Sequence, residues 1–219
     1  MPIELGSPTI RERLCGSWFL PSKTMGYGGS AVLVRPAGYA GRQKLEEPRR
    51  KEVAMSIARE HDLKPIIVGL VSDTHGLVRD SLIAALAGVS QILHAGDVGG
   101  RAVLDALGAI APVQAVYGNV DPLDGRLPQQ IVINVGGVTI HVSHGHELGR
   151  PTPAKLLATY PGDVLVYGHT HKALIEREGA RLVVNPGAAG PRRFDLKPSI
   201  ARLTIDGGRA EAELVWLEA

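Results

Sequence analysis

The sequence lacks several features that would place it in common protein classes. It contains one cysteine, Cys15, so an intramolecular disulfide is excluded. No apolar run approaches the roughly 18 residues that a membrane-spanning helix needs. The N-terminus also lacks the apolar stretch, roughly 7 to 15 residues long, that marks a secretory signal. These absences predict a protein of the reducing cytoplasm with no membrane partner.

Charge is distributed unevenly along the chain. The formal net charge of the 219 residues is +2, but residues 1–65 hold 11 Lys and Arg against 7 Asp and Glu, whereas residues 66–219 hold 13 against 15. The basic excess therefore belongs to the front segment and does not favour a nucleic-acid-binding function for the whole chain. Seven of the eight histidines lie after residue 65, which points to metal binding.

Composition also divides the chain into two parts. Residues 1–50 combine many glycines and prolines with no sustained helical or strand periodicity. We interpret residues 1–64 as an N-terminal extension, disordered or partly helical, with Met55 as a candidate internal start. A basic arm for an anionic partner is the less favoured alternative. Residues 65–219 are predicted to form one folded domain.

The first half of this domain alternates strands and helices. The β-branched run 66–71 is typical of a strand buried on both faces. Apolar positions at helical spacing follow in 77–86 and again in 103–107, separated by a short strand at 91–94 and followed by another at 113–117. This order predicts parallel strands joined by right-handed crossovers.

The second half is mainly strands. A hairpin is predicted at 131–135 and 138–142 around Gly136-Gly137, and one helix at 154–160. The remaining predicted strands are 164–167, 173–178, 182–184, 199–205 and 210–217. The predicted fold class is α/β, with two facing mixed β-sheets flanked by helices in a four-layer α/β/β/α sandwich.

Five short polar motifs follow predicted strands at intervals of 22 to 25 residues. They are Asp73-Thr74-His75, Gly96-Asp97, Gly118-Asn119-Val120-Asp121, His144-Gly145-His146 and Gly168-His169-Thr170-His171. Each motif alone is weak, because Asp-x-His and Gly-Asp are common and a lone buried histidine is usually part of the core. Together they supply oxygen and imidazole ligands at strand ends, where α/β proteins bind their ligands. The combination predicts a metal site.

The size of the ligand set predicts two metal ions. Two carboxylates, one amide oxygen and four imidazoles exceed what one ion needs if positions stay open for water and substrate. Two dications balanced by two carboxylates leave a charge of +2, which suits a hydroxide and one phosphodiester oxygen. This charge balance favours phosphoryl chemistry, in which paired metals activate the nucleophile and stabilise the developing charge.

On these motifs the sequence resembles the calcineurin-like metallophosphoesterase superfamily, whose signature has the same elements in the same order. The resemblance extends from Ile66 to about Leu217, and Asn185-Pro186-Gly187 is typical of its small bacterial and archaeal phosphodiesterases. It implies that Asp73, His75 and His171 hold one metal, that Asn119, His144 and His169 hold the other, and that Asp97 bridges both. Manganese is the implied metal, with iron, nickel, zinc and cobalt as alternatives.

The resemblance also implies a reaction. A metal-bridging hydroxide would attack phosphorus in line with the leaving group, with Asp97 and Asn119 in the catalytic centre. Many members have His at the position of Val120, where it is thought to protonate the leaving oxygen. That acid is absent here, and its loss typically costs about 10²- to 10⁴-fold with a poor leaving group. His146 is a candidate substitute, although it could instead orient its loop.

Other polar residues have two interpretations each. Arg192 and Arg193 could contact a substrate phosphate or could be solvated loop residues. Asp121 could orient a ligand imidazole or form a turn before Pro122. We expect His94 to be a buried, hydrogen-bonded histidine. Trp18 and Trp216 are distant from the motifs, so we expect them to pack and not to bind a ligand.

The sequence therefore predicts a phosphodiesterase with two metal ions, acting on small phosphodiesters or nucleotide-like substrates. The alternative is a non-catalytic interaction module, because the retromer scaffold subunit shares this fold and also lacks His at the position of Val120. That scaffold departs at the Asn of the third motif, whereas Asn119 is present here. This difference favours the enzyme. Members of the superfamily often assemble, so a homo-oligomer is compatible with the resemblance.

Overall fold

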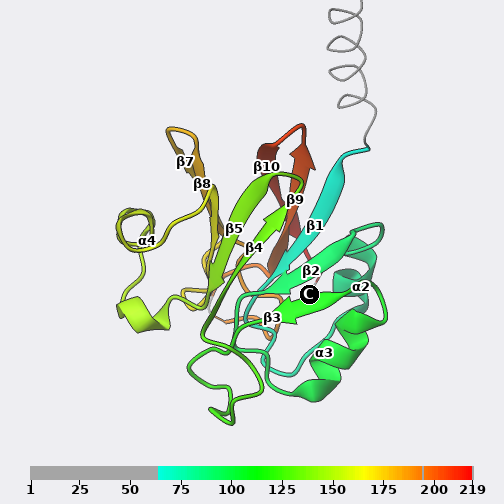
Figure 1. The fold of residues 1–219 in the computed structure, drawn as a ribbon. Coiled ribbons are helices and arrows are strands. Elements are labelled where there is room, and N and C mark those ends of the chain that lie inside the picture. Colours follow the sequence, from blue (N-terminus) through cyan, green and yellow to red (C-terminus); the bar gives the residue numbers. More distant parts are fainter. Residues whose placement is uncertain (1–63, 194, 219) are drawn as a thin grey trace, which may run out of the picture. The chain divides into compact units, whose positions relative to one another are not determined.

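The computed structural model describes residues 64–193 and 195–218 (Figure 1). The predicted extension, residues 1–64, lies outside this range apart from Lys64, as do Met55 and Trp18. None of the helices in the described part of the chain is long and apolar enough to cross a bilayer.

The first sheet has five strands in the order β10-β9-β1-β2-β3. Its centre consists of β1 (Ile66–Val71), β2 (Gln91–His94) and β3 (Val113–Ala115), which run parallel as predicted. On the other side of β1, the hairpin of β9 (Ser199–Asp206) and β10 (Arg209–Trp216) continues the sheet in antiparallel pairing. The parallel strands end at one edge of the sheet, where the first three polar motifs begin.

The second sheet also has five strands, in the order β4-β5-β6-β8-β7. Its strands are β4 (Gln130–Val135), β5 (Val138–Ser143), β6 (Val164–Val166), β7 (Leu174–Glu178) and β8 (Arg181–Asn185). Strands β4 and β5 pair as the predicted hairpin, and β6 is parallel to both β5 and β8. Parallel β5 and β6 therefore deliver the last two motifs to one edge of this sheet.

The two sheets face each other across an apolar interior. Val68 and Leu70 of β1 belong to the same buried cluster as Ile140 and Val142 of β5 and Val184 of β8. Strand β1 is buried from Val68 to Val71, which is why its sequence is a continuous apolar run and not an alternating one.

Helices cover the outer face of each sheet. On the first sheet these are α2 (Asp80–Ala85) and α3 (Arg101–Gly108), anchored by Leu82 and Leu107. On the second sheet it is α4 (Pro153–Thr159), whose Leu156 packs in one cluster with residues of β6 and β8. The predicted class of two facing mixed sheets with helices outside is confirmed (Figure 1).

Two details differ from the sequence prediction. Strand β3 ends at Ala115 instead of residue 117: the N–H of Val116 still donates to the His94 carbonyl, but the N–H of Tyr117 donates to Pro128 outside the sheet. Trp216 was expected to pack, but 57% of it is exposed on the edge strand β10.

Candidate metal centre

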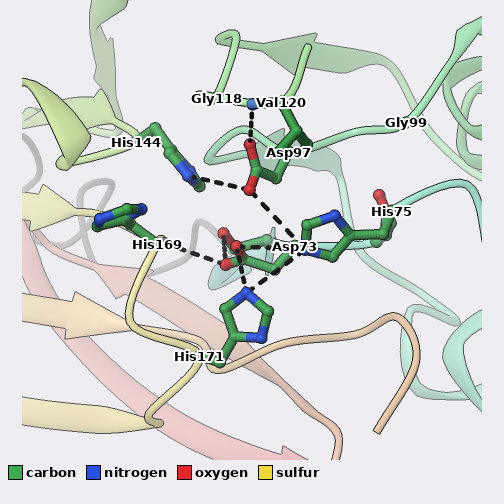
Figure 2. A network of polar contacts seen from close by, with 12 residues as sticks. Asp73, His75, Asp97, Gly99, Gly118, Val120, His144, His169 and His171 are labelled. Atoms are coloured by element: carbon green, nitrogen blue, oxygen red, sulfur yellow. Dashed lines mark hydrogen bonds and ion pairs between the residues drawn. The ribbon is translucent and has the colours of Figure 1, made fainter. Parts of the chain in front are cut away.

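The predicted ligands come from loops that leave the ends of five strands. Asp73 and His75 follow β1, Asp97 follows β2, Asn119 follows β3, His144 follows β5, and His169 and His171 follow β6. Because the parallel strands of both sheets end at the same edge of the sandwich, these side chains meet there, and Figure 2 labels all of them except Asn119. Residues up to 98 positions apart in the sequence thus face one another.

Backbone strain is concentrated at this centre. Positive φ angles at non-glycine residues occur, within the described chain, only at the predicted ligands Asp73, His75, Asp97, His169 and His171, between 46° and 66°. Side chains other than glycine rarely adopt this conformation, at a cost of order 1 to 3 kcal/mol each. Such strain persists where the surrounding structure enforces it, and it clusters at functional sites.

The first group of ligands consists of Asp73, His75, Asp97 and His171. One ligand atom from each lies within 4.8 Å of all the others, and only His75 is incompletely buried. His171 Nε2 is 3.1 Å from Asp73 Oδ1 and 3.4 Å from His75 Nε2. Two imidazole nitrogens at this distance, both facing a carboxylate oxygen, form an arrangement suited to one cation.

The second group consists of Asn119, His144, His169 and, again, Asp97. Asn119 Oδ1 lies 3.2 Å from His144 Nε2 and 2.9 Å from His169 Nδ1. His144 Nε2 is also 3.4 Å from Asp97 Oδ2. The same carboxylate oxygen is 3.8 Å from His75 Nε2 in the first group. Asp97 therefore lies between the two groups and contacts both.

Two buried atoms test whether the residues fit a cation. Asp73 Oδ1 is buried and accepts no hydrogen bond from the described residues, whereas its other oxygen accepts from Ser72 Oγ at 2.5 Å. The contact of His144 Nδ1 with the Ala95 carbonyl, at 2.7 Å, requires Nδ1 to carry a proton. His144 Nε2 is then the nitrogen that faces Asp97 and Asn119 oxygens. A metal ion suits both a buried carboxylate oxygen that accepts no hydrogen bond and an imidazole lone pair among oxygens.

The ionisable side chains of the centre change one another's pKa values. Burial raises the pKa of Asp97, but the hydrogen bond and charge of His144 and the N–H of Val120 outweigh it and lower the pKa to about 2. Burial lowers the pKa of His144, but the Asp97 and Asp73 carboxylates outweigh it and raise the pKa above its ordinary value. Burial, followed by the charge of His144, lowers the pKa of His169. Asp97 is therefore ionised at neutral pH and available to a cation.

Gly118 permits the close approach of two loops at the bridging residue. A Cβ at this position would lie 2.1 Å from Asp97 Oδ1 and 2.3 Å from the Asp97 backbone nitrogen. Contacts this short do not occur, so any side chain at Gly118 would displace Asp97. The glycine of the third motif therefore has a steric function at the candidate centre.

Asp121 has one of its two predicted roles: it closes a turn before Pro122, and its N–H donates to the Gly118 carbonyl at 3.3 Å. Its carboxylate accepts the backbone N–H groups of Val98, Gly99 and Gly118 at 2.9 to 3.0 Å, and it contacts no ligand imidazole. Those N–H groups belong to the loops that carry Asp97 and Asn119. Asp121 therefore ties together the two loops that supply the shared carboxylate and the amide.

His94 is a buried hydrogen-bonded histidine, as predicted. Its Nε2 lies 2.8 Å from Thr74 Oγ1, and that hydroxyl donates to the carbonyl of Val98, so Nε2 must be the donor to Thr74. Burial lowers the pKa of His94 to about 4, which keeps the ring neutral. The hydrogen bonds to His94 and Val98 thereby fix the side chain of Thr74, which lies between Asp73 and His75.

His146 lies beside the second group of ligands. It begins the 3₁₀ turn η1 (His146–Leu148), and its ring centroid is 5.3 Å from that of His144 and 6.3 Å from that of His169. His146 Nδ1 is 3.5 Å from Glu147 Oε2. The Glu147 carboxylate is held in turn by the N–H of Gly145 and the hydroxyl of Tyr160. His146 is therefore near the centre but outside both ligand groups.

Arg192 and Arg193 are exposed at the rim on the side of the first group. Together with His171 and Lys197 they line a shallow hollow. Burial is the main cause of the lowered pKa of His75, and the nearby Arg193 charge adds to the effect. The structure thus places the two arginines next to the ligands, with their guanidinium groups free of ion pairs to described carboxylates.

Several supporting residues were not found from the sequence. Asn185 Nδ2 donates to the Gly168 carbonyl at 2.9 Å and to Thr170 Oγ1 at 3.0 Å, which positions the loop between His169 and His171. In the sequence, Asn185-Pro186-Gly187 indicates the kind of phosphodiesterase but not this structural role. Ser72 and Glu147 carry no signal in the sequence, because their partners are defined only by the folded chain.

Comparisons with known proteins agree with this geometry. Residues 66–208 match the family model of the calcineurin-like phosphoesterase superfamily domain. The chain is 34% identical to the probable metallophosphoesterase MJ0623 of Methanocaldococcus jannaschii, over 70% of this chain and 82% of that protein. It is 28% identical to the phosphodiesterase MJ0936 of the same organism, over 55% of this chain and 82% of that protein.

A solved structure of similar fold binds metal. Wild-type Vps29 of Entamoeba histolytica, crystallised in complex with Zn²⁺, aligns with a TM-score of 0.57 and 26% identity. The alignment covers 70% of this chain and all of that chain. The fold is therefore shared by proteins named as phosphoesterases and by Vps29.

Proposed function

The chain belongs to the calcineurin-like phosphoesterase superfamily, and we propose that it is a phosphodiesterase that depends on two divalent metal ions. One observation carries this proposal: seven oxygen and nitrogen ligands lie in two groups that share the carboxylate of Asp97. Two cations sharing one carboxylate are the arrangement that phosphoryl transfer uses.

Asp73, His75 and His171 would hold one ion, Asn119, His144 and His169 the other, and Asp97 both. Manganese is the metal we propose, because the resemblance to the superfamily implies it. The ligand set has no thiolate and would also suit iron, nickel, zinc or cobalt. Bound ions supply a Lewis acid that lowers the pKa of water and stabilises charge on phosphoryl oxygens. The chain contributes the fixed ligand geometry, which the strained backbone and Asp121 maintain.

Hydrolysis adds water across one P–O bond, so a phosphodiester becomes a phosphomonoester and an alcohol. The oxygen that leaves must gain a proton unless its conjugate acid is strong. Val120 cannot provide it, but His146 is near the second ligand group, and Glu147 lies against its Nδ1. We propose His146 as the donor, with Nε2 as the atom that delivers the proton.

Substitution His146→Ala tests this role by its dependence on the leaving group. For a diester with an alkyl leaving group, kcat should fall by about 10²- to 10⁴-fold, whereas bis(4-nitrophenyl) phosphate should be much less affected because nitrophenolate leaves unprotonated. Metal content should match that of the unmodified protein. Equal slowing of both substrates would remove His146 from the role of acid.

The reaction class is tested by comparing two nitrophenyl substrates with the manganese-loaded protein. We expect kcat/KM to be higher for bis(4-nitrophenyl) phosphate than for 4-nitrophenyl phosphate, because two cations and two carboxylates leave a charge that suits a monoanionic diester. Faster hydrolysis of the monoester would contradict a phosphodiesterase.

The rival proposal is a non-catalytic, metal-binding interaction module of the same fold. Structural similarity to Vps29 motivates it. The complete ligand set, including Asn119, favours the enzyme. Full metal binding without hydrolysis of any phosphoester would favour the module.

A further inference from the structure

The rim of the metal centre has two chemically different sides. Beside His171, on the side of the first ligand group, lie the exposed cations Arg192, Arg193 and Lys197, here called the cationic side. After Asn119 in the chain come the exposed apolar residues Val120 and Leu123, here called the apolar side, and the N–H of Val120 donates to Asp97 Oδ1. Figure 2 shows Val120 and His171 on opposite sides of Asp73 and Asp97.

The cationic side is anchored directly to the first ligand group. The N–H of Gly190 donates to the Asp73 carbonyl at 3.1 Å, and the N–H of Ala189 donates to the Ser72 carbonyl at 2.9 Å. The Arg79 guanidinium donates to the Gly190 carbonyl at 2.9 Å. A Cβ at Gly190 would be 2.3 Å from the Thr74 carbonyl oxygen, so only glycine allows this approach. Arg192 and Arg193 therefore follow, by two and three residues, the fixed contact of Gly190 with Asp73.

The charge on this side exceeds what a simple diester needs. None of Arg192, Arg193 and Lys197 forms an ion pair with a carboxylate of the described chain, and Asp195 is the one acidic residue among described residues 190–198. Two metal ions with Asp73 and Asp97 already match a hydroxide and a monoanionic diester. Additional guanidinium groups nearby would attract a second anion, and arginine binds phosphate in a bidentate manner.

The apolar side has an uncharged side chain, that of Val120, next to the metal centre. The backbone of Val120 is fixed, because its N–H donates to Asp97 Oδ1 at 3.1 Å, yet 56% of the residue is exposed. Leu123 is 79% exposed, and the neighbouring Asp124 and Arg126 pair with each other at 3.1 Å. An uncharged ring covering Val120 and Leu123 would remove apolar surface from water, which is favourable.

We propose that the substrate is a nucleotide-like phosphodiester that carries a second phosphate on one arm and an uncharged ring on the other. This inference rests on the proposed phosphodiesterase function. The second phosphate lies on the cationic side, bound by Arg192, Arg193 and Lys197, and the ring lies on the apolar side over Val120 and Leu123. Hydrolysis breaks the P–O bond to the ring-bearing arm, with water supplying OH to phosphorus, and releases a bisphosphate, an alcohol or phenol, and one proton at neutral pH.

Two matched substrates test the charge requirement. Thymidine 5′-(4-nitrophenyl phosphate) and its 3′-phosphorylated analogue differ in one phosphate and share the leaving group. We expect KM to be about tenfold lower for the 3′-phosphorylated substrate, with similar kcat, since the extra interaction is remote from the reacting phosphorus. The double substitution Arg192→Ala/Arg193→Ala should remove that preference and leave the KM of the other substrate nearly unchanged.

Arg209→Ala is the matched control, because Arg209 is an exposed arginine at the β9–β10 hairpin. It should retain the preference. Equal KM values for the two substrates in the unmodified protein, or an undiminished preference in the double variant, would overturn the proposed second-phosphate site.

A binding measurement separates this proposal from the proposed function. Calorimetry with the manganese-loaded protein should show tighter binding of thymidine 3′,5′-bisphosphate than of thymidine 5′-monophosphate, and the double variant should bind both alike. If neither nitrophenyl ester is hydrolysed but this difference is found, the phosphodiesterase assignment fails and the anion site stands. If hydrolysis occurs without any such difference, the anion site fails alone.

Leu123→Ser tests the apolar side. It should raise the KM of thymidine 5′-(4-nitrophenyl phosphate) severalfold and leave the binding of thymidine 3′,5′-bisphosphate unchanged, because only the former carries the nitrophenyl ring on the arm proposed to lie over the apolar side. An unchanged KM would overturn this part of the proposal.

Discussion

Replacing Asp97 with alanine is expected to remove nearly all hydrolysis and most of the bound metal. Among the described residues, Asp97 Oδ2 is the one carboxylate oxygen that contacts imidazoles of both ligand groups, His75 at 3.8 Å and His144 at 3.4 Å. Its loss takes one negative charge from both proposed ions at once. Substituting a residue that only supports a metal ligand typically reduces metal affinity by about 10- to 100-fold. Loss of a ligand shared by two ions should reduce it by more.

The measurement is metal content per chain together with kcat/KM for bis(4-nitrophenyl) phosphate, where we expect a loss of roughly 10³-fold or more. Asp105→Ala is the matched control. Asp105 is an exposed carboxylate paired with Arg101 on α3, and such surface pairs contribute little to stability. If Asp97→Ala kept full metal content, the assignment of two ions sharing this carboxylate would be wrong.

Replacing Gly118 with alanine is expected to reduce activity by about 10²-fold without removing any of the proposed ligands. The added Cβ would lie 2.1 Å from Asp97 Oδ1 and 2.3 Å from its backbone nitrogen, so Asp97 must move. A displacement of about 1 Å in a catalytic group can cost about 10²-fold. The φ angle of Gly118 is not positive, so the loss would come from the steric contact and not from backbone conformation.

Gly108→Ala provides the control for this substitution. Gly108 is the last residue of α3, and a Cβ there would meet no atom within 4 Å. Activity and metal affinity of Gly108→Ala should equal those of the unmodified protein. Gly118→Ala should show a reduced kcat/KM and weaker binding of manganese in a titration. Unchanged values would mean that the two loops do not fix the position of Asp97.

Much of the fold was predictable because burial leaves a pattern in the sequence. The run 66–71 is continuously apolar since β1 lies between the second sheet and the helices, and the alternation of strands and helices up to residue 115 specified parallel strands. Convergence of the motifs followed from the same pattern, because parallel strands end at one edge. The structure brings all seven predicted ligands together there.

The residues that hold the ligands in place were less predictable. Asp121 binds N–H groups of residues 98 and 99, more than 20 positions away, and such a contact depends on how the loops approach each other. The hydrogen bond of Glu147 to Tyr160 likewise depends on where α4 packs. The end of β3 could not be located from apolar residues alone, since Val116 is buried although it lies outside the strand.

The most direct test of the central claim is a manganese titration of the metal-free protein in which metal binding and hydrolysis of bis(4-nitrophenyl) phosphate are followed together. We predict saturation at about two ions per chain, no hydrolysis without manganese, and full activity only when the second ion is bound. Saturation at one ion, or two bound ions with no hydrolysis, would contradict a phosphodiesterase that depends on two metal ions.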